Sequence, residues 1–537
     1  MRLSDLVKAI PELLPLPDSI SETQITGITS DSNKVKPGFV FVALKGEKTD
    51  GGKFIPQAEQ NGAVVVISSL RGGEADVAIQ QPDNTGLLPA TPSARSRNDE
   101  SLPHILVQNP RLALAKMAAA FYEKQPENIV AITGTDGKTS TADFFRQLMY
   151  LAGKKSASVG TIGVIVCHPV SNKVAAQDLV DIARDPAQPT AHRMTGLTTP
   201  DSVALHKMLA EMAEGGVDYL AMEASSHGLS QYRLDGVDLK AAAFTNIARD
   251  HLDYHKTEEA YFIAKARLFS ELLPERAAAV LNQDDRRYGE LKAICEKRGH
   301  KIICFGRKGS DFTINSITPT AHGQHAELTL FDKKYSVEVP LVGEFQVMNI
   351  LAALGLAVGC GADLEKLLSV VGKLKGVSGR LEQVVTTKNG AAVFIDYAHT
   401  PMALENILRT LRPHTKNKLH VVFGCGGDRD AGKRPLMGKI ASEFADFVIV
   451  TDDNPRSENP ETIRAAIMVG ISKEKNCKEV ADRAQAIYLA IQQLQAGDIL
   501  VLAGKGHEKV QIIGDKNLPF DDAEIARNAA RDLGVAT

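Results

Sequence analysis

The chain has 537 residues, a net charge of −3 and 44% hydrophobic residues. One hydrophobic core stops growing at about 250–300 residues, so we expect several domains. The small net charge argues against nucleic acid or an anionic membrane as a partner. The sequence has no apolar run of about 20 residues, no secretory-signal pattern and no CxxC pair among its six cysteines. We therefore expect a cytoplasmic protein.

Short apolar runs alternate with helical patterns along most of the chain. The expected strands are 40–44, 63–67, 128–133, 217–223, 241–246, 278–282, 301–305, 392–397, 419–424, 446–451 and 498–504. Helices are expected at 138–152, 201–215, 402–412, 461–472 and 482–495. This alternation predicts an α/β protein with mostly parallel sheets.

Three stretches interrupt the pattern. Residues 70–104 and about 168–193 are polar and predict surface insertions. In residues 372–380, glycines end a helical pattern before a strand restarts, which predicts a domain junction.

A glycine-rich segment follows the strand predicted at 128–133. Its residues are Gly134, Thr135, Asp136, Gly137, Lys138, Thr139 and Ser140. Such a loop closes backbone N–H groups on phosphate, with Lys138 reaching the terminal phosphates and Thr139 binding Mg²⁺. Ile132 stands where the first glycine of a P-loop is usual. An ordinary glycine turn with a surface lysine is the alternative.

Metal-ligand residue types follow the next two predicted strands. Glu223 ends one strand, and Asn246, Asp250 and His251 follow the other. Carboxylate and imidazole groups at strand ends beside a P-loop can hold Mg²⁺ against phosphates. Taken singly, His251 is as well explained as a structural histidine, and Lys265, further on, as a solvated helix residue.

Polar loops follow the late strands as well. They are 396–401, 424–435, 451–460 and 503–508. Ligands of open α/β sheets bind at the carboxyl ends of strands, so these loops predict a cationic pocket for phosphate or carboxylate. Its cations are Arg429, Lys433, Arg434, Arg456 and Lys505. Solvated loops are the alternative.

Taken together, these segments resemble the Mur ligase family from about residue 26 to 530, outside the two polar insertions. The segments that carry the resemblance are GTDGKTS (134–140), TTPD (198–201), MEASSHGLSQYR (222–233), FTNIARDHLDYHKTEEAYFIAKARLF (244–269), GVSGRLE (376–382), DYAHTP (396–401), GCGGDRDAGKRPLMG (424–438) and DNPR (453–456). Three residues depart from the family's usual pattern: Asp136 replaces asparagine, Asn33 replaces arginine, and Gln346 replaces asparagine.

The resemblance implies three domains and a cytoplasmic monomer. Residues 1–125 would bind the UDP end of a substrate, 126–376 would form a central P-loop ATPase domain, and 377–537 a Rossmann-like domain for an amino acid. The implied partners are ATP, Mg²⁺, UDP-N-acetylmuramoyl-dipeptide and meso-diaminopimelate.

The resemblance also assigns roles to residues. Lys138, Lys265, His251 and Glu223 would be catalytic, and Thr139, Glu223, His251 and carbamylated Lys265 would hold the metal. ATP would contact the Gly134–Ser140 loop, Asn349, Arg380 and Asp396. The muramoyl-peptide would contact Ser32, Thr198, Thr199, Ser225, Gln231 and Arg233. The amino acid would contact Arg429, Asp453, Asn454, Arg456, Gly504 and Glu508.

The implied reaction forms an acyl phosphate from ATP and a substrate carboxylate, which an amine then attacks. Ligation of L-lysine and folate polyglutamylation remain alternatives of the same kind. A regulatory P-loop switch leaves the C-terminal pocket unexplained. GCGGDRD (424–430) is a poor match to the GxGxxG of a dinucleotide oxidoreductase. A non-catalytic nucleotide-sugar binder is the alternative of a different class.

Overall fold

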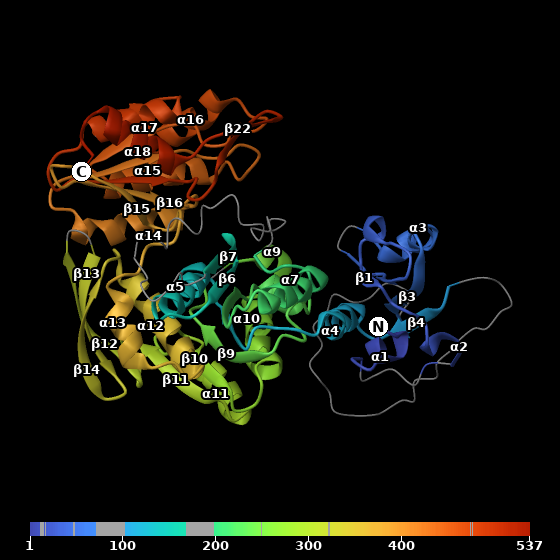
Figure 1. Ribbon diagram of the computed structural model, residues 1–537. Coiled ribbons are helices and arrows are strands. Elements are labelled where there is room, and N and C mark those ends of the chain that lie inside the picture. Colours follow the sequence, from blue (N-terminus) through green and yellow to red (C-terminus); the bar gives the residue numbers. More distant parts are fainter. Residues whose placement is uncertain are drawn as a thin grey trace. The chain divides into compact units, whose positions relative to one another are not determined.

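The computed structural model describes residues 1–10, 16, 18–46, 49–70, 102–167, 198–248, 250–320, 323–472, 474 and 476–536 (Figure 1). The insertions predicted near 70–104 and 168–193 lie almost entirely outside the described residues. The chain divides into two compact units. The first comprises Met1–Lys138, Phe145–Cys304 and Ala352–Ala362, and the second Thr139–Phe144, Phe305–Leu351 and Asp363–Thr537.

The N-terminal sheet is parallel and has helices on both faces. Its order is β1 (Gly27–Thr29), β2 (Phe39–Val42), β3 (Ala63–Ser69) and β4 (His104–Val107). Successive side chains of a strand point to opposite faces. Val40 and Val42 therefore pack with α1 (Leu3–Val7) and α4 (Pro110–Tyr122), while Phe41 packs with α3 (Ile55–Gln60).

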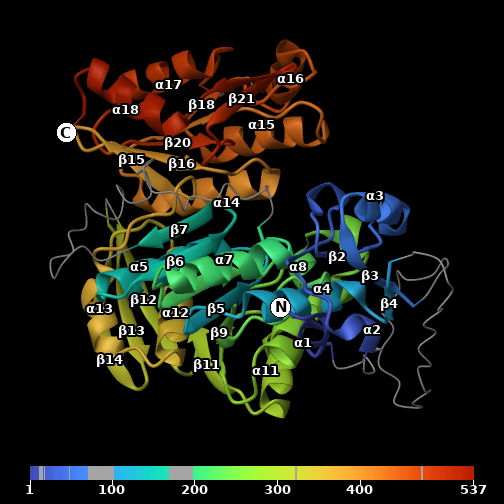
Figure 2. The same cartoon turned by 45° about the vertical axis from the view of Figure 1, so that its right-hand side comes forward.

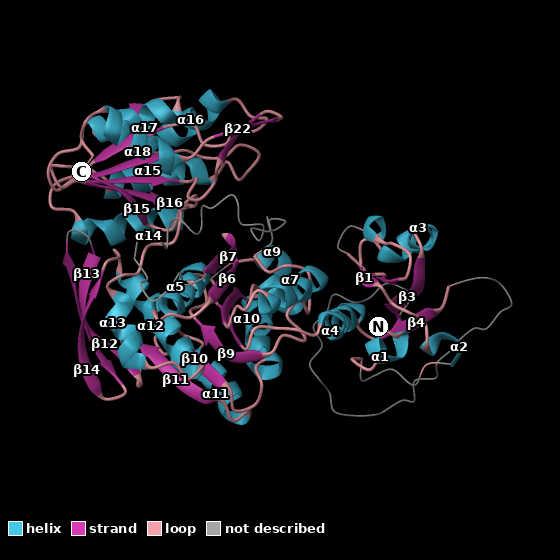
Figure 3. Cartoon of the chain, viewed as in Figure 1, coloured by secondary structure: helices cyan, strands magenta, loops and turns pink. Residues whose placement is uncertain are grey.

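A ten-stranded sheet follows in the order β14-β13-β12-β11-β10-β9-β5-β8-β6-β7. Its strands are β5 (Asn128–Thr133), β6 (Ser156–Gly160), β7 (Gly163–Cys167), β8 (Tyr219–Glu223), β9 (Leu239–Phe244), β10 (Ala278–Asn282), β11 (Lys301–Gly306), β12 (Phe312–Thr320), β13 (Gly323–Leu330) and β14 (Lys333–Val339). The central strands β5, β8 and β9 are parallel and buried, as their continuous apolar runs require. The β12–β14 strands form an antiparallel meander, visible in Figure 3.

Helices cover the parallel part of this sheet. One face packs against α7 (Ser202–Glu214), α8 (Ser226–Ser230), α10 (Glu258–Arg267) and α11 (Tyr288–Lys297). Helix α12 (Glu344–Gly359) approaches β9 and β10 through two glycines one turn apart. A Cβ at Gly355 would lie 2.7 Å from the Val280 side chain, and one at Gly359 2.7 Å from Ala278 Cβ. Larger residues there would push the helix off the sheet.

Shorter elements connect these layers. They are α2 (Asp18–Ser21), η1 (Ser32–Lys34), η2 (Gly51–Phe54), α9 (Leu252–His255), η4 (Leu268–Leu272), α13 (Leu364–Val371) and η5 (Arg412–His414). Within the part of the chain that the structure describes, no helix is long and apolar enough to cross a membrane.

The C-terminal domain is a six-stranded sheet between two helical layers (Figure 2). Its order is β15 (Glu382–Thr386), β16 (Ala392–Asp396), β20 (Ile499–Ala503), β17 (Leu419–Phe423), β18 (Phe447–Val450) and β19 (Cys477–Glu479), parallel except for β15. Helices α14 (Pro401–Leu411), α15 (Lys433–Phe444) and α16 (Pro460–Met468) cover one face, and α17 (Arg483–Gln492) and α18 (Asp522–Asp532) the other. A hairpin of β21 (Val510–Ile513) and β22 (Lys516–Pro519) follows β20.

A fully buried ion pair joins α17 to α18. The Arg483 guanidinium donates to both carboxylate oxygens of Asp522, at 2.8 and 2.6 Å, and to the Ala503 carbonyl at 3.0 Å. Both side chains are 0% exposed. Removal of one partner would leave a charge buried without compensation, which costs far more than losing the pair as a whole.

We expect Asp522→Ala to lower the free energy of unfolding by about 3–5 kcal/mol. The double variant Arg483→Met with Asp522→Leu should lose less, because no charge remains buried. Thermal unfolding of the full chain measures both. Glu405→Ala is the control, since it removes an exposed ion pair with Arg409 and should change stability by ~1 kcal/mol or less. Equal losses in the single and double variants would contradict this expectation.

Candidate functional site

The phosphate loop lies between β5 and helix α5 (Lys138–Leu151). Its two glycines have left-handed backbone angles, with φ of 149° at Gly134 and 84° at Gly137. A Cβ at Gly134 would lie 1.9 Å from Thr245 Oγ1. Glycine is therefore required at Gly134 both for its angle and for its space.

Strand register places two predicted site segments beside this loop. Ile132 of β5 pairs with Glu223 of β8, and Thr133 pairs with Phe244 of β9. The ends of β8 and β9 therefore flank the end of β5. This carboxyl edge of parallel strands is where open α/β sheets bind ligands.

The segment after β9 holds the phosphate loop in shape. Asn246 Oδ1 accepts from the Asp136 amide at 2.9 Å, and the Asn246 carbonyl accepts from the Thr135 amide at 2.9 Å. Thr245 Oγ1 donates to the Asp136 carbonyl at 2.6 Å. The Asp136 side chain itself is exposed. Its replacement of asparagine leaves this backbone bracing intact.

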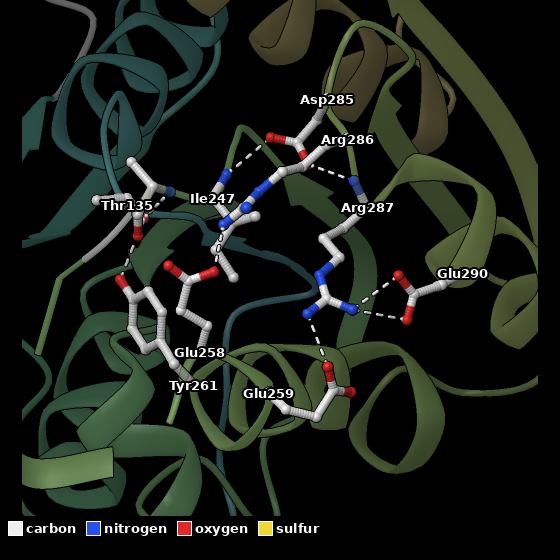
Figure 4. Close-up of polar contacts among 10 residues, drawn as sticks. Thr135, Ile247, Glu258, Glu259, Tyr261, Asp285, Arg286, Arg287 and Glu290 are labelled. Carbon is white, nitrogen blue, oxygen red and sulfur yellow. Dashed lines mark hydrogen bonds and ion pairs between the residues drawn. The ribbon is translucent and has the colours of Figure 1, made fainter. Parts of the chain in front are cut away.

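Helix α10, the turn at 283–287 and the start of α11 support the same region (Figure 4). Tyr261 OH lies 3.2 Å from Thr135 Oγ1, and the Asp285 carboxylate accepts from the Ile247 amide at 2.8 Å. Arg287 bridges Glu259 at 2.7 Å and Glu290 at 2.8 Å, which ties α10 to the turn.

Two lysines meet at the first carbonyl of the loop. Lys138 Nζ donates to the carbonyls of Gly134 and Thr135, at 3.0 and 2.7 Å. Lys265 Nζ donates to the same Gly134 carbonyl at 2.6 Å, lies 4.4 Å from the centre of the Tyr261 ring and is 1% exposed. Burial, and then the nearby Lys138 ammonium, hold the pKa of the Lys265 amine well below its usual range. A solvated helix residue does not have this environment.

Glu223 is buried beside the start of β7. Its Oε1 accepts from the Thr161 amide at 2.7 Å and its Oε2 from Thr161 Oγ1 at 3.2 Å. A Cβ at Gly160 would lie 2.0 Å from Glu223 Oε1, so only glycine leaves room for the carboxylate. Thr161 and Gly160 are site residues that sequence reasoning missed, because no motif marks them.

His251 immediately precedes α9, with a left-handed φ of 52° and an imidazole 47% exposed. Its ring lies 5.0 Å from that of His227 and 6.0 Å from that of Tyr261. Tyr261 therefore contacts both His251 and Lys265.

The predicted magnesium site needs oxygen donors close to the phosphate loop. No group of three or more His, Cys, Asp or Glu is placed to hold a metal among the described residues. Hard oxygen donors are nevertheless present, in the Thr139 hydroxyl at the start of α5 and the buried Glu223 carboxylate. Magnesium uses few protein ligands and takes the rest from phosphate and water, so these residues fit it.

Most of the predicted peptide-binding residues form one network around the end of β8. Thr199 Oγ1 lies 3.0 Å from Ser225 Oγ and donates to the Glu223 carbonyl at 2.9 Å. Arg233 donates to the Thr199 carbonyl and to Gln231 Oε1, both at 2.7 Å. Thr198 joins the network, since its Oγ1 lies 3.3 Å from Thr161 Oγ1.

Ser32 belongs to the N-terminal sheet. Its Oγ donates to Gln57 Oε1 at 2.8 Å, and Gln57 Nε2 donates to Asn33 Oδ1 at 2.9 Å. Asn33, which replaces the family's usual arginine, is thus linked to Ser32 by hydrogen bonds through the Gln57 side chain.

The predicted adenine contact Asn349 is buried on α12, one turn from Gln346. Gln346 Oε1 is buried and has no hydrogen-bond partner within the described ranges. Such an oxygen can accept from an exocyclic amine of a base.

Arg380 and Asp396 lie close together in the C-terminal domain, since the Arg380 charge acts on the Asp396 carboxylate. The Asp396 carboxylate accepts from the amides of Leu381 and Ala398, both at 2.8 Å. Burial raises the pKa of that carboxyl above its usual value, and the Arg380 charge opposes the rise. The Arg380 guanidinium lies 5.1 Å from the centre of the Tyr397 ring.

The loops after β18 and β20 meet in the predicted amino-acid pocket. A Cβ at Gly504 would lie 2.7 Å from Asp453 Oδ2, and Asn454 Nδ2 donates to Glu508 Oε2 at 2.9 Å. Arg456 has a left-handed φ of 52° and donates one N–H to the Gly427 carbonyl at 2.8 Å. The other guanidinium N–H groups of Arg456 have no protein acceptor in the described part of the chain.

Two of the five cations predicted for this pocket are buried and bonded within the protein. Arg434 is 3% exposed and donates to both oxygens of Glu458, at 2.8 and 2.9 Å. Lys505 is 0% exposed and donates to Asn454 Oδ1 and to the Val510 carbonyl. The sequence places both in the right loops but does not reveal their burial. Arg429 and Lys433 donate to the carbonyls of Asp428 and His399, both from exposed positions.

Three models of one protein family match most of the chain. Residues 24–122 match the Mur ligase family catalytic domain, 132–357 the Mur ligase middle domain, and 379–506 the Mur ligase glutamate ligase domain. A curated UDP-N-acetylmuramoyl-L-alanyl-D-glutamate--2,6-diaminopimelate ligase of Rhizobium meliloti (strain 1021) is 45% identical over 99% of this chain and 100% of its own length. The chain belongs to the Mur ligase family.

Other relatives agree. The ligase of the same name from Caulobacter vibrioides is 42% identical over 96% of this chain and 97% of its own length. A solved structure with that name has a TM-score of 0.70 and 33% identity, and covers 99% of this chain and 100% of the solved chain. The predictions of a three-domain α/β fold and of an ATP-dependent amide-bond-forming ligase are therefore confirmed. The domain boundaries and the individual site residues stay predictions.

We expect Lys138→Ala to lower ligation by about 10²–10³-fold or more without unfolding the chain, because its ammonium acts on the transferred phosphate and not on a core. Phosphate release from ATP measures turnover, and circular dichroism checks the fold. Lys154→Ala is the control, since Lys154 lies beyond the C-terminal end of the same helix. A folded Lys138→Ala protein with near-parent turnover would refute the phosphate-loop assignment.

Proposed function

We propose that the chain adds meso-diaminopimelate to UDP-N-acetylmuramoyl-L-alanyl-D-glutamate with ATP, through an acyl phosphate. Relatives of the same length that carry this activity in their names support the proposal. The observation that carries it is that the loops bearing Arg456 and Glu508 meet, since Asn454 of the Arg456 loop donates to Glu508. A guanidinium with unused N–H groups suits a carboxylate, and a carboxylate suits an ammonium.

The two ends of diaminopimelate explain why both groups are needed. Lysine shares the distal amine of diaminopimelate but lacks the carboxylate beside it. Arg456 would bind that carboxylate and Glu508 the amine. Asp453 and Gly504 would line the pocket, and Arg429 would approach from its exposed loop. Ligation of L-lysine leaves the free guanidinium N–H groups of Arg456 without a role.

In the first step a substrate carboxylate attacks the terminal phosphate of ATP. Both groups are anionic, so their approach needs positive charge. Lys138 would leave its two loop carbonyls to bind the transferred phosphate. Thr139, Glu223 and His251 would hold Mg²⁺, which when bound offsets the charge of the phosphates. Thr198, Thr199, Ser225, Gln231 and Arg233 would orient the peptide, and Ser32 the uridine end.

Nucleotide recognition would use residues of α12 and of the C-terminal domain. Gln346 and Asn349 would contact adenine, with Gln346 Oε1 as an acceptor. Arg380 and Asp396 would contact the ribose. In the second step the amine of diaminopimelate attacks the acyl carbon and expels phosphate, so water must be excluded until the amine arrives.

We further propose that Lys265 works as a carbamate. Only an uncharged amine reacts with carbon dioxide, and an ordinary lysine is almost wholly protonated at neutral pH. Because burial lowers the pKa of the Lys265 amine, its uncharged fraction at neutral pH exceeds that of an ordinary lysine. The anionic product then reverses the sign of the charge beside the phosphate loop.

We expect Lys265→Ala and Lys265→Arg to be nearly inactive, and a short carboxylate in solution to restore part of the activity of Lys265→Ala. Arginine keeps its positive charge and forms no carbamate. In ¹³C-bicarbonate the parent should show a carbamate NMR signal that falls as pH is lowered, because protonation removes the free amine. Lys265→Arg should lack it. Full activity of Lys265→Arg would contradict the carbamate.

We expect Arg456→Ala to impair use of meso-diaminopimelate by about 30-fold to several-thousand-fold, since loss of one partner of a buried charge pair costs roughly 2–5 kcal/mol. KM for ATP and for the UDP-dipeptide should stay near the parent values. Steady-state ligation with meso-diaminopimelate and L-lysine side by side measures this. A parent preference for lysine, or an equal rise of all three KM values, would overturn the specificity.

A further inference from the structure

Lys505 is a buried cation whose bonding capacity is used up within the protein. Its Nζ donates to the Val510 carbonyl at 2.6 Å and to Asn454 Oδ1 at 3.1 Å, and lies 3.4 Å from Glu508 Oε2. An ammonium has three N–H donors, so none remains for a substrate. Lys505 instead joins the loops after β18 and β20 to strand β21.

The contacts of Lys505 fix the orientation of the Asn454 amide. Asn454 Oδ1 accepts from Lys505 and from the Ile512 amide at 3.0 Å. A flipped amide would place its NH₂ group against an ammonium and a backbone N–H. The Asn454 Nδ2 group therefore has to face Glu508, to which it donates at 2.9 Å.

Glu508 is held through one oxygen only. Its Oε2 receives Asn454 Nδ2 and the Lys505 ammonium. Its Oε1 has no hydrogen-bond partner among the residues that the structure describes, and the side chain is 29% exposed. Oε2 is thus held by the protein, and Oε1 is left for a ligand.

We propose that Lys505 is a positioning residue for amine recognition. Through Asn454 and the Glu508 carboxylate, it aims Glu508 Oε1 at the distal ammonium of diaminopimelate. This inference rests on the proposed function. Lys505 acts on recognition of the amine and not on recognition of the carboxylate. The carboxylate is bound by the N–H groups of Arg456, for which no contact with Lys505 occurs among the described residues.

The test compares meso-diaminopimelate with L-2-aminopimelate, which keeps both carboxylates but lacks the distal amine. The parent should favour diaminopimelate in kcat/KM. In Lys505→Met this preference should fall by at least ~10-fold, chiefly through KM for diaminopimelate, because a misdirected charge pair loses its ligand. KM for ATP and for the UDP-dipeptide should stay within about twofold, and the preference for diaminopimelate over L-lysine should persist, because both of these carry the amine.

Lys509→Met is the matched control. It removes a lysine four residues away whose exposed ammonium pairs with Asp521, and it should leave the preference unchanged. A folded Lys505→Met protein that keeps the parent preference would overturn the inference, even if its Tm were lower. A merely structural lysine would give that result.

A second variant decides the matter if Lys505→Met does not fold. Asn454→Leu keeps the lysine and removes the amide that connects it to Glu508. A fall in the preference for the amine supports the inference, and an unchanged preference overturns it. A parent enzyme that does not ligate diaminopimelate at all would overturn the proposed function as well, whereas failure of the inference alone leaves that ligation intact.

Discussion

The hydrogen bond from Lys265 to the Gly134 carbonyl is the contact on which the rest of the central site depends. It joins α10 to the turn that follows β5, and it places a second amine beside Lys138. Two ammonium groups on one carbonyl repel each other, and burial makes the repulsion stronger because water cannot screen it. The repulsion disappears when Lys265 is uncharged, and it would become an attraction to Lys138 if Lys265 became an anion. The same burial that makes a charged lysine unfavourable there thus favours the uncharged amine that the proposed carbamate requires.

The C-terminal pocket follows a related design with a different outcome. Lys505 is buried as completely as Lys265, but it lies against a carboxylate and two oxygen acceptors. Its charge is therefore balanced within the protein. The proposed roles of the two buried lysines therefore differ, one in chemistry and one in positioning, because their neighbouring groups differ.

The sequence predicts much of the fold, because buried parallel strands are continuous apolar runs. All eleven expected strands occur, among them 128–133 as β5 and 498–504 as β20. The antiparallel meander β12–β14 was not predicted, since its solvent-facing alternation of polar and apolar residues is a weaker signal than a buried run. The predicted phosphate-loop segment lies between a strand and a helix as expected.

The sequence could not predict which of the candidate site residues are buried and bonded within the protein. Arg434 and Lys505 are cationic residues of the type that binds anions. In the structure, however, Arg434 donates to Glu458 and Lys505 donates to Asn454. Those partners lie 24 and 51 residues away along the chain. Thr161 and Gly160 likewise matter only because β6 brings them to Glu223. Such roles depend on tertiary contacts and leave no local pattern.

The left-handed backbone of His251 and Arg456 has a consequence for how this protein can evolve. At both positions a non-glycine residue adopts an angle that disfavours any side chain with a Cβ, by about 1 kcal/mol or more. Glycine would relieve that strain while deleting a proposed ligand group. Selection for thermal stability alone would therefore favour sequences that lack the proposed ligand groups at these two positions. Stability and the proposed ligand roles are opposed there, so a stabilised variant that keeps both groups has to gain its stability elsewhere in the chain.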